Sequence, residues 1–276
     1  HIDVSWLWRT RESRRKMARS MATALQLMDE CPDYRFMYNQ CVLFDWLAAD
    51  YHELFERLRA KVAGGQFEIE GALWLEPDVN IAGGEALVRH ILKGVHYHQR
   101  TFGVRPRLMW LPDTFGYSAA LPQLMALAGL ETFVTHKLSW NDTNRMPHDT
   151  FFWEGIDGTR RPASFVTTQT YEYDGIETTY CADLRASHVL GTYKRHADKA
   201  AMPELFMIYG HGDGGGGPTR AMIETLRRFE RGIPGSPRVR QGALGDYFAR
   251  LAARMAASPE CFPVWVGELY LEFHRG

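Results

Sequence analysis

The stretch Arg107-Leu-Met-Trp-Leu-Pro-Asp-Thr-Phe-Gly-Tyr117 contains the pattern on which the rest of the chain is built. A short apolar run, typical of a buried strand, is followed at once by a carboxylate, Asp113, with aromatic residues on both sides. A carboxylate held there is poorly placed for solubility and well placed for chemistry. We therefore expect Asp113 to belong to a functional site, although a turn residue that caps a helix near Ala119 would also explain it.

Strand-like and helical patterns alternate along the chain. The expected strands are His1–Trp8, Tyr34–Gln40, Phe67–Leu75, Leu108–Leu111, Thr132–Leu138, Ser164–Thr168, Leu205–Tyr209 and Val264–Leu271. The expected helices are Thr10–Cys31, Leu43–Val62, Glu85–Phe102, Ala119–Ala128, Leu184–Lys199, Thr219–Arg231 and Leu244–Ala257. This order predicts an α/β fold, with a mostly parallel β-sheet or a seven-stranded β/α barrel-like domain and helices outside. The least regular segment, Trp140–Gln169, is expected to be a loop that faces the substrate.

Composition limits the class of protein. The chain has 276 residues, of which 45% are hydrophobic, and this suits one α/β domain over residues 1–276 with a substantial core. A formal net charge of −1 without basic or acidic tails predicts no nucleic-acid partner and no anionic membrane. No run of apolar residues is long enough to span a membrane. Four scattered cysteines, with no Cys-x-x-Cys pair, are typical of reduced thiols and favour a cytoplasmic protein without a thiolate zinc site.

Two further sites resemble Asp113 in placing polar side chains next to an apolar run. His1 and Asp3 begin the first run, and His274 follows the last. In a mostly parallel sheet the ligand site lies at the carboxyl ends of the strands, so we expect these groups to meet. His1, Asp3, Asp113 and His274 would form a ligand set for a divalent metal such as zinc. Taken singly, each is explained equally well as a solvated terminal or strand-end residue.

The run Gly210-His-Gly-Asp-Gly-Gly-Gly-Gly-Pro218 has the most unusual composition in the chain. A phosphate-binding loop is disfavoured, because the Gly-Lys-Ser/Thr ending is missing. The glycines allow the backbone to approach a ligand closely, which would put Asp213 beside the site with His211 as its neighbour. A plain flexible turn remains the alternative. His136 and Asp78, which each end a strand, are further candidates for contact with a substrate, and the aromatic rings around Asp113 favour a sugar.

Several segments together resemble the glycoside hydrolase family 38 α-mannosidases, most closely the cytosolic and bacterial branch. They are His1-Ile-Asp-Val-Ser-Trp-Leu-Trp8, Glu76-Pro-Asp78, Trp110-Leu-Pro-Asp-Thr-Phe-Gly-Tyr-Ser118, Lys137-Leu-Ser-Trp-Asn-Asp142, His211-Gly-Asp-Gly-Gly-Gly-Gly217 and Glu268-Leu-Tyr-Leu-Glu-Phe-His-Arg275. The likeness runs from the first residue to the last. It also implies longer relatives, so we expect this chain to be an N-terminal catalytic domain that lacks C-terminal helical and β-rich domains, which would be its partners.

The resemblance implies a retaining α-mannosidase that acts on mannose-containing oligosaccharides with one zinc ion, or cobalt in its place. By motif, His1, Asp3, Asp113 and His274 would be the metal ligands. Asp113 would also be the nucleophile, and Asp213 the general acid and base. The metal would bind the cis 2- and 3-hydroxyls of mannose, whereas Trp6 and Phe115 would form walls of the sugar pocket.

Two other functions agree with the same residues. A zinc-dependent carbohydrate deacetylase also places His and Asp ligands at strand ends, but it would release acetate with metal-bound water. A fragment that binds mannose through zinc without turnover is the non-enzymatic alternative.

Overall fold

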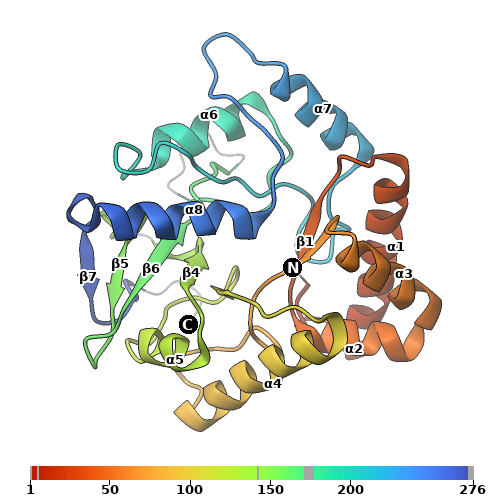
Figure 1. Ribbon diagram of the computed structural model, residues 1–276, viewed down its shortest axis with the longest axis horizontal. Coiled ribbons are helices and arrows are strands. Elements are labelled where there is room, and N and C mark those ends of the chain that lie inside the picture. The colour runs from red at the N-terminus through yellow and green to blue at the C-terminus, as the bar shows by residue number, and fades with distance from the viewer. Residues whose placement is uncertain (1, 5, 142, 171–176, 273–276) are drawn as a thin grey trace.

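Two sheets form the centre of the protein (Figure 1). The computed structural model describes residues 2–4, 6–141, 143–170 and 177–272, and within them β1 (Phe36–Tyr38) pairs in parallel with β2 (Phe67–Ile69). The second sheet has the strand order β3-β4-β6-β5-β7. Its strands are β3 (Leu108–Trp110), β4 (Thr132–Thr135), β5 (Thr150–Glu154), β6 (Arg160–Phe165) and β7 (Val264–Val266). The predicted α/β fold with mostly parallel strands is confirmed, although its strands divide between two sheets.

The prediction of an irregular loop over Trp140–Gln169 is wrong, because this segment contains β5 and β6. These two strands form the antiparallel pair of the larger sheet and are joined by a tight turn. In that turn the Asp157 carboxylate accepts hydrogen bonds from the backbone N–H and hydroxyl of Thr159, and Gly158 has a φ of 81°. An Asp-Gly pair between two apolar runs is a recognised hairpin signal, so the turn was readable from the sequence.

The helices surround the sheets. They are α1 (Thr10–Glu30), α2 (Cys41–Asp50), α3 (His52–Ala63), α4 (Gly84–Phe102), α5 (Leu121–Ala128), α6 (Ala186–Arg195), α7 (Arg220–Glu230) and α8 (Leu244–Ala257), with 3-10 turns at Lys137–Ser139 and Pro259–Cys261. The helix expected over Leu43–Val62 is in fact two helices, which break at Tyr51, where φ is −143°. Strands were also expected at His1–Trp8 and Leu205–Tyr209. The described residues of these segments form none, apart from an isolated bridge between Ala182 and Tyr209.

The strands β3 and β4 of the larger sheet are buried on both faces. Leu108, Trp110 and Val134 point to one face, where they pack with Phe248 and Leu251 of α8. Figure 1 shows α8 lying across this face. The alternate residues of the same strands point to the opposite face, as expected for the two-residue repeat of a strand. They include Met109 and Phe133, and they pack with residues of α4 and α5. A strand that is buried on both faces reads as a continuous apolar run, as it does here.

The smaller sheet packs with α1, α2 and α3 in a separate core. Its connection to the larger sheet depends on a buried carboxylate, Glu70, which follows β2 directly. Oε2 of Glu70 accepts hydrogen bonds from the backbone N–H groups of Arg107 (3.0 Å) and Leu108 (3.1 Å) where β3 begins. Burial raises the pKa of this carboxyl group to about 7. Glu70 therefore joins the end of β2 to the start of β3 by hydrogen bonds. The burial of its carboxyl group opposes this gain, because a buried charge loses its hydration.

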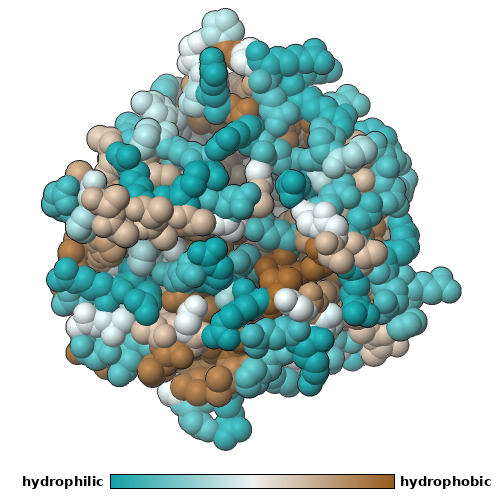
Figure 2. Space-filling model, viewed as in Figure 1, coloured by the Kyte–Doolittle hydropathy of each residue, from teal (hydrophilic) through white to brown (hydrophobic). Residues whose placement is uncertain are grey.

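Hydrophobic surface appears in separate patches among hydrophilic residues on the face seen in Figure 2. The most exposed large apolar side chains include Leu7, Ile81, Leu127, Ile156 and Val266. No helix in the described part of the chain combines the length and the apolar character needed to cross a membrane. Contact with further C-terminal domains stays a prediction.

Candidate active site

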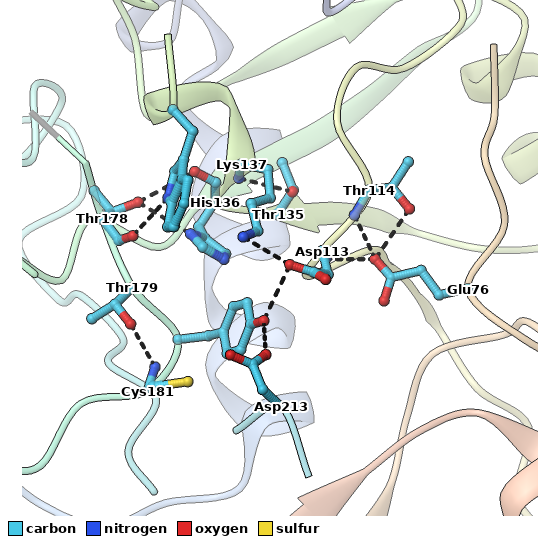
Figure 3. Close-up of polar contacts among 12 residues, drawn as sticks. Glu76, Asp113, Thr114, Thr135, His136, Lys137, Thr178, Thr179, Cys181 and Asp213 are labelled. Atoms are coloured by element: carbon cyan, nitrogen blue, oxygen red, sulfur yellow. Dashed lines mark hydrogen bonds and ion pairs between the residues drawn. The ribbon is translucent and has the colours of Figure 1, made fainter. Parts of the chain in front are cut away.

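Asp113 lies beyond the carboxyl end of β3, where two groups from distant parts of the chain contact its side chain (Figure 3). The Lys137 ammonium lies 2.7 Å from Oδ1, and the Tyr180 hydroxyl lies 3.1 Å from the same oxygen. Lys137 lies two residues after the end of β4, which is the parallel neighbour of β3. The carboxyl ends of two adjacent parallel strands thus supply a carboxylate and an ammonium group to one site, as the position of sites in α/β folds predicts.

Glu76 fixes the backbone that carries Asp113. Its Oε1 accepts hydrogen bonds from the backbone N–H groups of Asp113 (2.5 Å) and Thr114 (2.7 Å) and from the Thr114 hydroxyl (3.1 Å). In the loop after β3, Asp113 and Thr114 belong to neither a helix nor a strand. The single carboxylate of Glu76 accepts the hydrogen bonds of their backbone N–H groups instead. Asp113 is positioned by residues far away in sequence rather than by its neighbours.

Aromatic rings surround the Lys137 ammonium group. It lies 3.9 Å from the centre of the Trp140 ring and 4.8 Å from that of Phe115, and the lysine side chain is only 6% exposed. The ring faces and Oδ1 of Asp113 together compensate for the loss of water around the cation. The ring of Phe115 thus forms part of the lysine pocket, and its role as a wall of a sugar pocket stays a prediction.

Asp213 occupies the glycine-rich loop and reaches Tyr180 from the other side. Its Oδ1 lies 2.5 Å from the Tyr180 hydroxyl, and its backbone has a φ of 54°. Asp tolerates this left-handed region better than most residues, and such conformations concentrate at functional sites. Asp113 and Asp213, predicted from separate motifs, are therefore brought together on opposite sides of one phenol.

Tyr180 is buried, with 8% exposure, and packs edge-on against the His136 ring at 4.6 Å between centroids. Burial, followed by the charges of Asp113 and Asp213, raises the pKa of Tyr180 far above its ordinary value. The hydroxyl therefore keeps its proton at all ordinary pH values. His136 is 3% exposed, so it lies behind Tyr180, and direct contact between His136 and a substrate stays a prediction.

The remaining residues that were predicted to contact a substrate are Trp6, Asp78 and His211. Trp6 is 59% exposed and packs edge-on against Trp8. Asp78 is exposed, and its Oδ1 accepts hydrogen bonds from the backbone N–H groups of Asn80 and Ile81 in a local turn. His211 is also exposed and forms a backbone bridge with Gly217 that closes the glycine-rich loop. Their contacts with a sugar stay predictions.

Of the four predicted metal ligands, His1 and His274 lie outside the described residues. Asp3 is half-buried, and its backbone carbonyl accepts hydrogen bonds from Trp8 Nε1 and the Ser13 hydroxyl. Within residues 2–272, where the structure describes them, no three His, Cys, Asp or Glu side chains are grouped to hold a metal ion.

Segments near both ends of the described chain contact residues that lie near Asp113 in the sequence or line the same cavity as Tyr180. Leu269 exchanges two backbone hydrogen bonds with Tyr117, four residues after Asp113. The Glu272 carboxylate accepts hydrogen bonds from the backbone N–H groups of Thr143 and Asn144. At the other end, Ile2 lines a cavity of about 1480 Å³ together with Pro112 and Tyr180.

A pair of carboxylates that lie close together, as Asp113 and Asp213 do, is typical of glycoside hydrolases. The comparisons with known proteins identify the family. Residues 1–268 match the glycosyl hydrolases family 38 N-terminal domain, and the chain belongs to that family. This membership favours a glycosidase over the deacetylase alternative.

Known relatives cover the whole chain. It is 40% identical over 281 residues to the alpha-mannosidase of Saccharomyces cerevisiae and 41% identical over 276 residues to alpha-mannosidase 2C1 of Homo sapiens. In both comparisons all of this chain is matched, whereas it spans only 25% of the relative's length. The crystal structure of an alpha-mannosidase from Enterococcus faecalis V583 superposes with a TM-score of 0.75 and 20% identity, covering 98% of this chain and 30% of that one. That structure shares the fold.

Sequence reasoning did not assign a role to Lys137 or Tyr180. Lys137 carried a readable signal, because it follows an apolar strand next to the strand of Asp113. Tyr180 lies in an irregular segment without periodicity, so only the structure reveals that it contacts both carboxylates.

Proposed function

We propose that the chain carries the active site of a retaining α-mannosidase, with Asp113 as nucleophile and Asp213 as general acid and base. The observation that carries this proposal is the short span between the two carboxylates. Oδ1 of Asp113 and Oδ1 of Asp213 lie 3.1 Å and 2.5 Å from the same phenolic oxygen, so they are at most about 5.6 Å apart. Retaining glycosidases separate the two carboxyl groups by about 5–5.5 Å, whereas inverting enzymes need about 6.5–9.5 Å to admit water.

The roles follow from the surroundings of each carboxylate. Asp113 is oriented by Glu76 through its backbone and by Lys137 at Oδ1, which suits a group that must attack the anomeric carbon from a fixed direction. Asp213 lies on an exposed loop, where it can reach the oxygen of a leaving group and later a water molecule. It would protonate that oxygen in the first step and deprotonate the water in the second.

We propose zinc, or cobalt in its place, as the cofactor, held by His1, Asp3, Asp113 and His274. Two features of the described residues fit this ion: Asp3 and Asp113 supply carboxylate oxygens of a kind that zinc accepts, and the Tyr38 hydroxyl near Asp3 is buried with no hydrogen-bond partner among the described residues. When bound, the metal would supply a Lewis acid for neighbouring sugar hydroxyls.

The proposed substrate is a mannose-containing oligosaccharide. The curated relatives named above are alpha-mannosidases, and the aromatic rings of Phe115 and Trp140 surround the lysine that contacts Asp113, which supports a sugar ring as the ligand. Because the chain spans a quarter of those relatives, we propose that the active enzyme contains further C-terminal parts as partners of this domain.

The test is hydrolysis of an aryl α-mannoside by the full-length gene product, with the first-formed sugar followed by NMR. We expect α-mannose before mutarotation, no cleavage of the matched α-glucoside, and loss of activity after chelation that zinc or cobalt restores. First-formed β-mannose would contradict the retaining mechanism. Release of acetate from an acetylated sugar without glycoside cleavage would support the deacetylase, and metal-dependent mannose binding without turnover would support the binding fragment.

A further inference from the structure

Tyr180 links the two carboxylates of the proposed mechanism. We propose that Tyr180 is a positioning residue, which holds Asp213 at the distance from Asp113 that leaving-group protonation requires. This inference rests on the proposed function and extends it to a residue outside the two carboxylates. The contacts that carry it are those of the phenolic oxygen with Oδ1 of Asp113 (3.1 Å) and with Oδ1 of Asp213 (2.5 Å) (Figure 3).

The side of Tyr180 that faces Asp113 is rigid. The tyrosine ring is buried and packs against His136, whose backbone carbonyl accepts a hydrogen bond from the Thr178 hydroxyl. The Lys137 ammonium, which contacts Asp113, lies 5.5 Å from the centre of the tyrosine ring. The phenolic oxygen therefore has a defined position relative to Asp113, because packing and polar contacts restrain both side chains.

On its other side, Tyr180 contacts the glycine-rich loop that carries Asp213. Asp213 is exposed and follows Gly212, at which an added Cβ would lie 2.5 Å from Cys181 Sγ and 2.7 Å from Cε2 of Tyr180. The loop backbone is thus seated directly on Tyr180 and Cys181, where only glycine fits. Seated in this way, Asp213 reaches the phenol with its carboxylate while its backbone stays in the left-handed region.

This arrangement has a chemical signature. If Tyr180 positions the general acid, its hydroxyl matters most when the leaving oxygen must be protonated, and little when the leaving group departs as a stable anion. Release of mannose from the covalent intermediate would also slow, because Asp213 activates the water in that step. A residue that only stabilises the fold would affect all substrates equally.

The experiment compares phenyl and 2,4-dinitrophenyl α-mannoside in the full-length gene product carrying Tyr180→Phe. We expect kcat/KM to fall about 100-fold for the phenyl substrate and no more than about threefold for the dinitrophenyl one, the difference being the contribution of a positioned acid. With the dinitrophenyl substrate kcat and KM should fall together, because the covalent intermediate accumulates. Tyr247→Phe removes another buried hydroxyl, one that contacts the Glu204 carbonyl, and should affect neither substrate.

Equal losses on both substrates, or no loss on either, would overturn the inference while leaving the proposed function intact. A wild-type protein that cleaves neither mannoside would instead overturn the proposed function. Gly212→Ala provides a second, independent variant, because its Cβ would push the loop off Tyr180 and Cys181. It should produce the same dependence on the leaving group, and an equal loss on both substrates would count against the positioning role.

Discussion

The ammonium group of Lys137 lies 2.7 Å from Oδ1 of Asp113 at the carboxyl ends of two neighbouring parallel strands. The lysine is 6% exposed and the aspartate 24%, so the pair is shielded from bulk water on the lysine side. A buried charge pair of this kind contributes little net stability but fixes the geometry of both partners. The orientation of Asp113 therefore depends on a cation from the next strand.

Lys137→Met should lower kcat/KM by about 100-fold, because a carboxylate that is misplaced by about an ångström attacks poorly. The measurement is steady-state kinetics with an aryl α-mannoside. Lys61→Met is the matched control, since Lys61 also lies 2.7 Å from an aspartate, Asp29, but on the surface between α3 and α1. Similar losses in the two variants would contradict the special role of Lys137.

Asp113→Asn should reduce turnover by about 10⁴-fold or more, because an amide cannot form the covalent intermediate. A mechanism-based fluorinated mannosyl fluoride should add its sugar mass to the peptide that contains Asp113, and the Asn variant should remain unlabelled. Asp157→Asn, in the exposed turn between β5 and β6, should be labelled as the wild type is. A label on another peptide would reject Asp113 as the nucleophile.

Glu76→Ala should destabilise the protein by about 1–3 kcal/mol, because it leaves the N–H groups of Asp113 and Thr114 without their acceptor. Activity should fall as well, since the same loop carries the nucleophile. Glu76→Gln keeps an acceptor oxygen and should lose clearly less in both respects. Chemical denaturation and kinetics on the two variants give the comparison, and equal losses would show that the charge of Glu76 matters rather than its hydrogen bonds.

Glu70 should make stability depend on pH, because burial raises its folded-state pKa from the ordinary 4.5 to about 7. The folded protein then holds a proton that the unfolded chain has lost, so stability falls as pH rises from about 4.5 to about 7. Relative to Glu70→Gln, wild type should lose up to about 3 kcal/mol across this range. Urea denaturation at pH 4.5 and pH 8 tests this, and a constant difference between the two proteins would refute it.

Gly94→Ala should destabilise the protein by about 1–3 kcal/mol, because a Cβ at this position of α4 would overlap with the Ala72 carbonyl oxygen. Gly84→Ala at the start of the same helix meets no neighbouring atom and should be neutral, or stabilising by up to about 1 kcal/mol. Thermal denaturation of both variants separates the two effects. A neutral Gly94→Ala would mean that α4 can move away from the sheet.

The strands β3 and β4 were readable because they are continuous apolar runs that are buried on both faces. The sequence also singled out Asp113 and Asp213, and in the structure both side chains contact the same phenolic oxygen, whereas their catalytic roles stay predictions. Prediction from the sequence failed where the structure depends on contacts between distant residues rather than on the periodicity of apolar residues. The break at Tyr51 carries no glycine or proline, so the pattern over Leu43–Val62 continues through it. Tyr180 has no pattern of its own, because its role comes from two residues that the fold brings to it.

Asp113 takes its position from Glu76, Lys137 and Tyr180, and Tyr180 in turn meets Asp213. These contacts join segments separated by up to 67 residues, so closing them is slow compared with forming the helices. During synthesis on the ribosome, the first helices can form as they emerge, yet the carboxylate pair cannot be assembled until residue 213 has left the exit tunnel. The proposed pair of catalytic carboxylates is therefore completed only late in the synthesis of this domain.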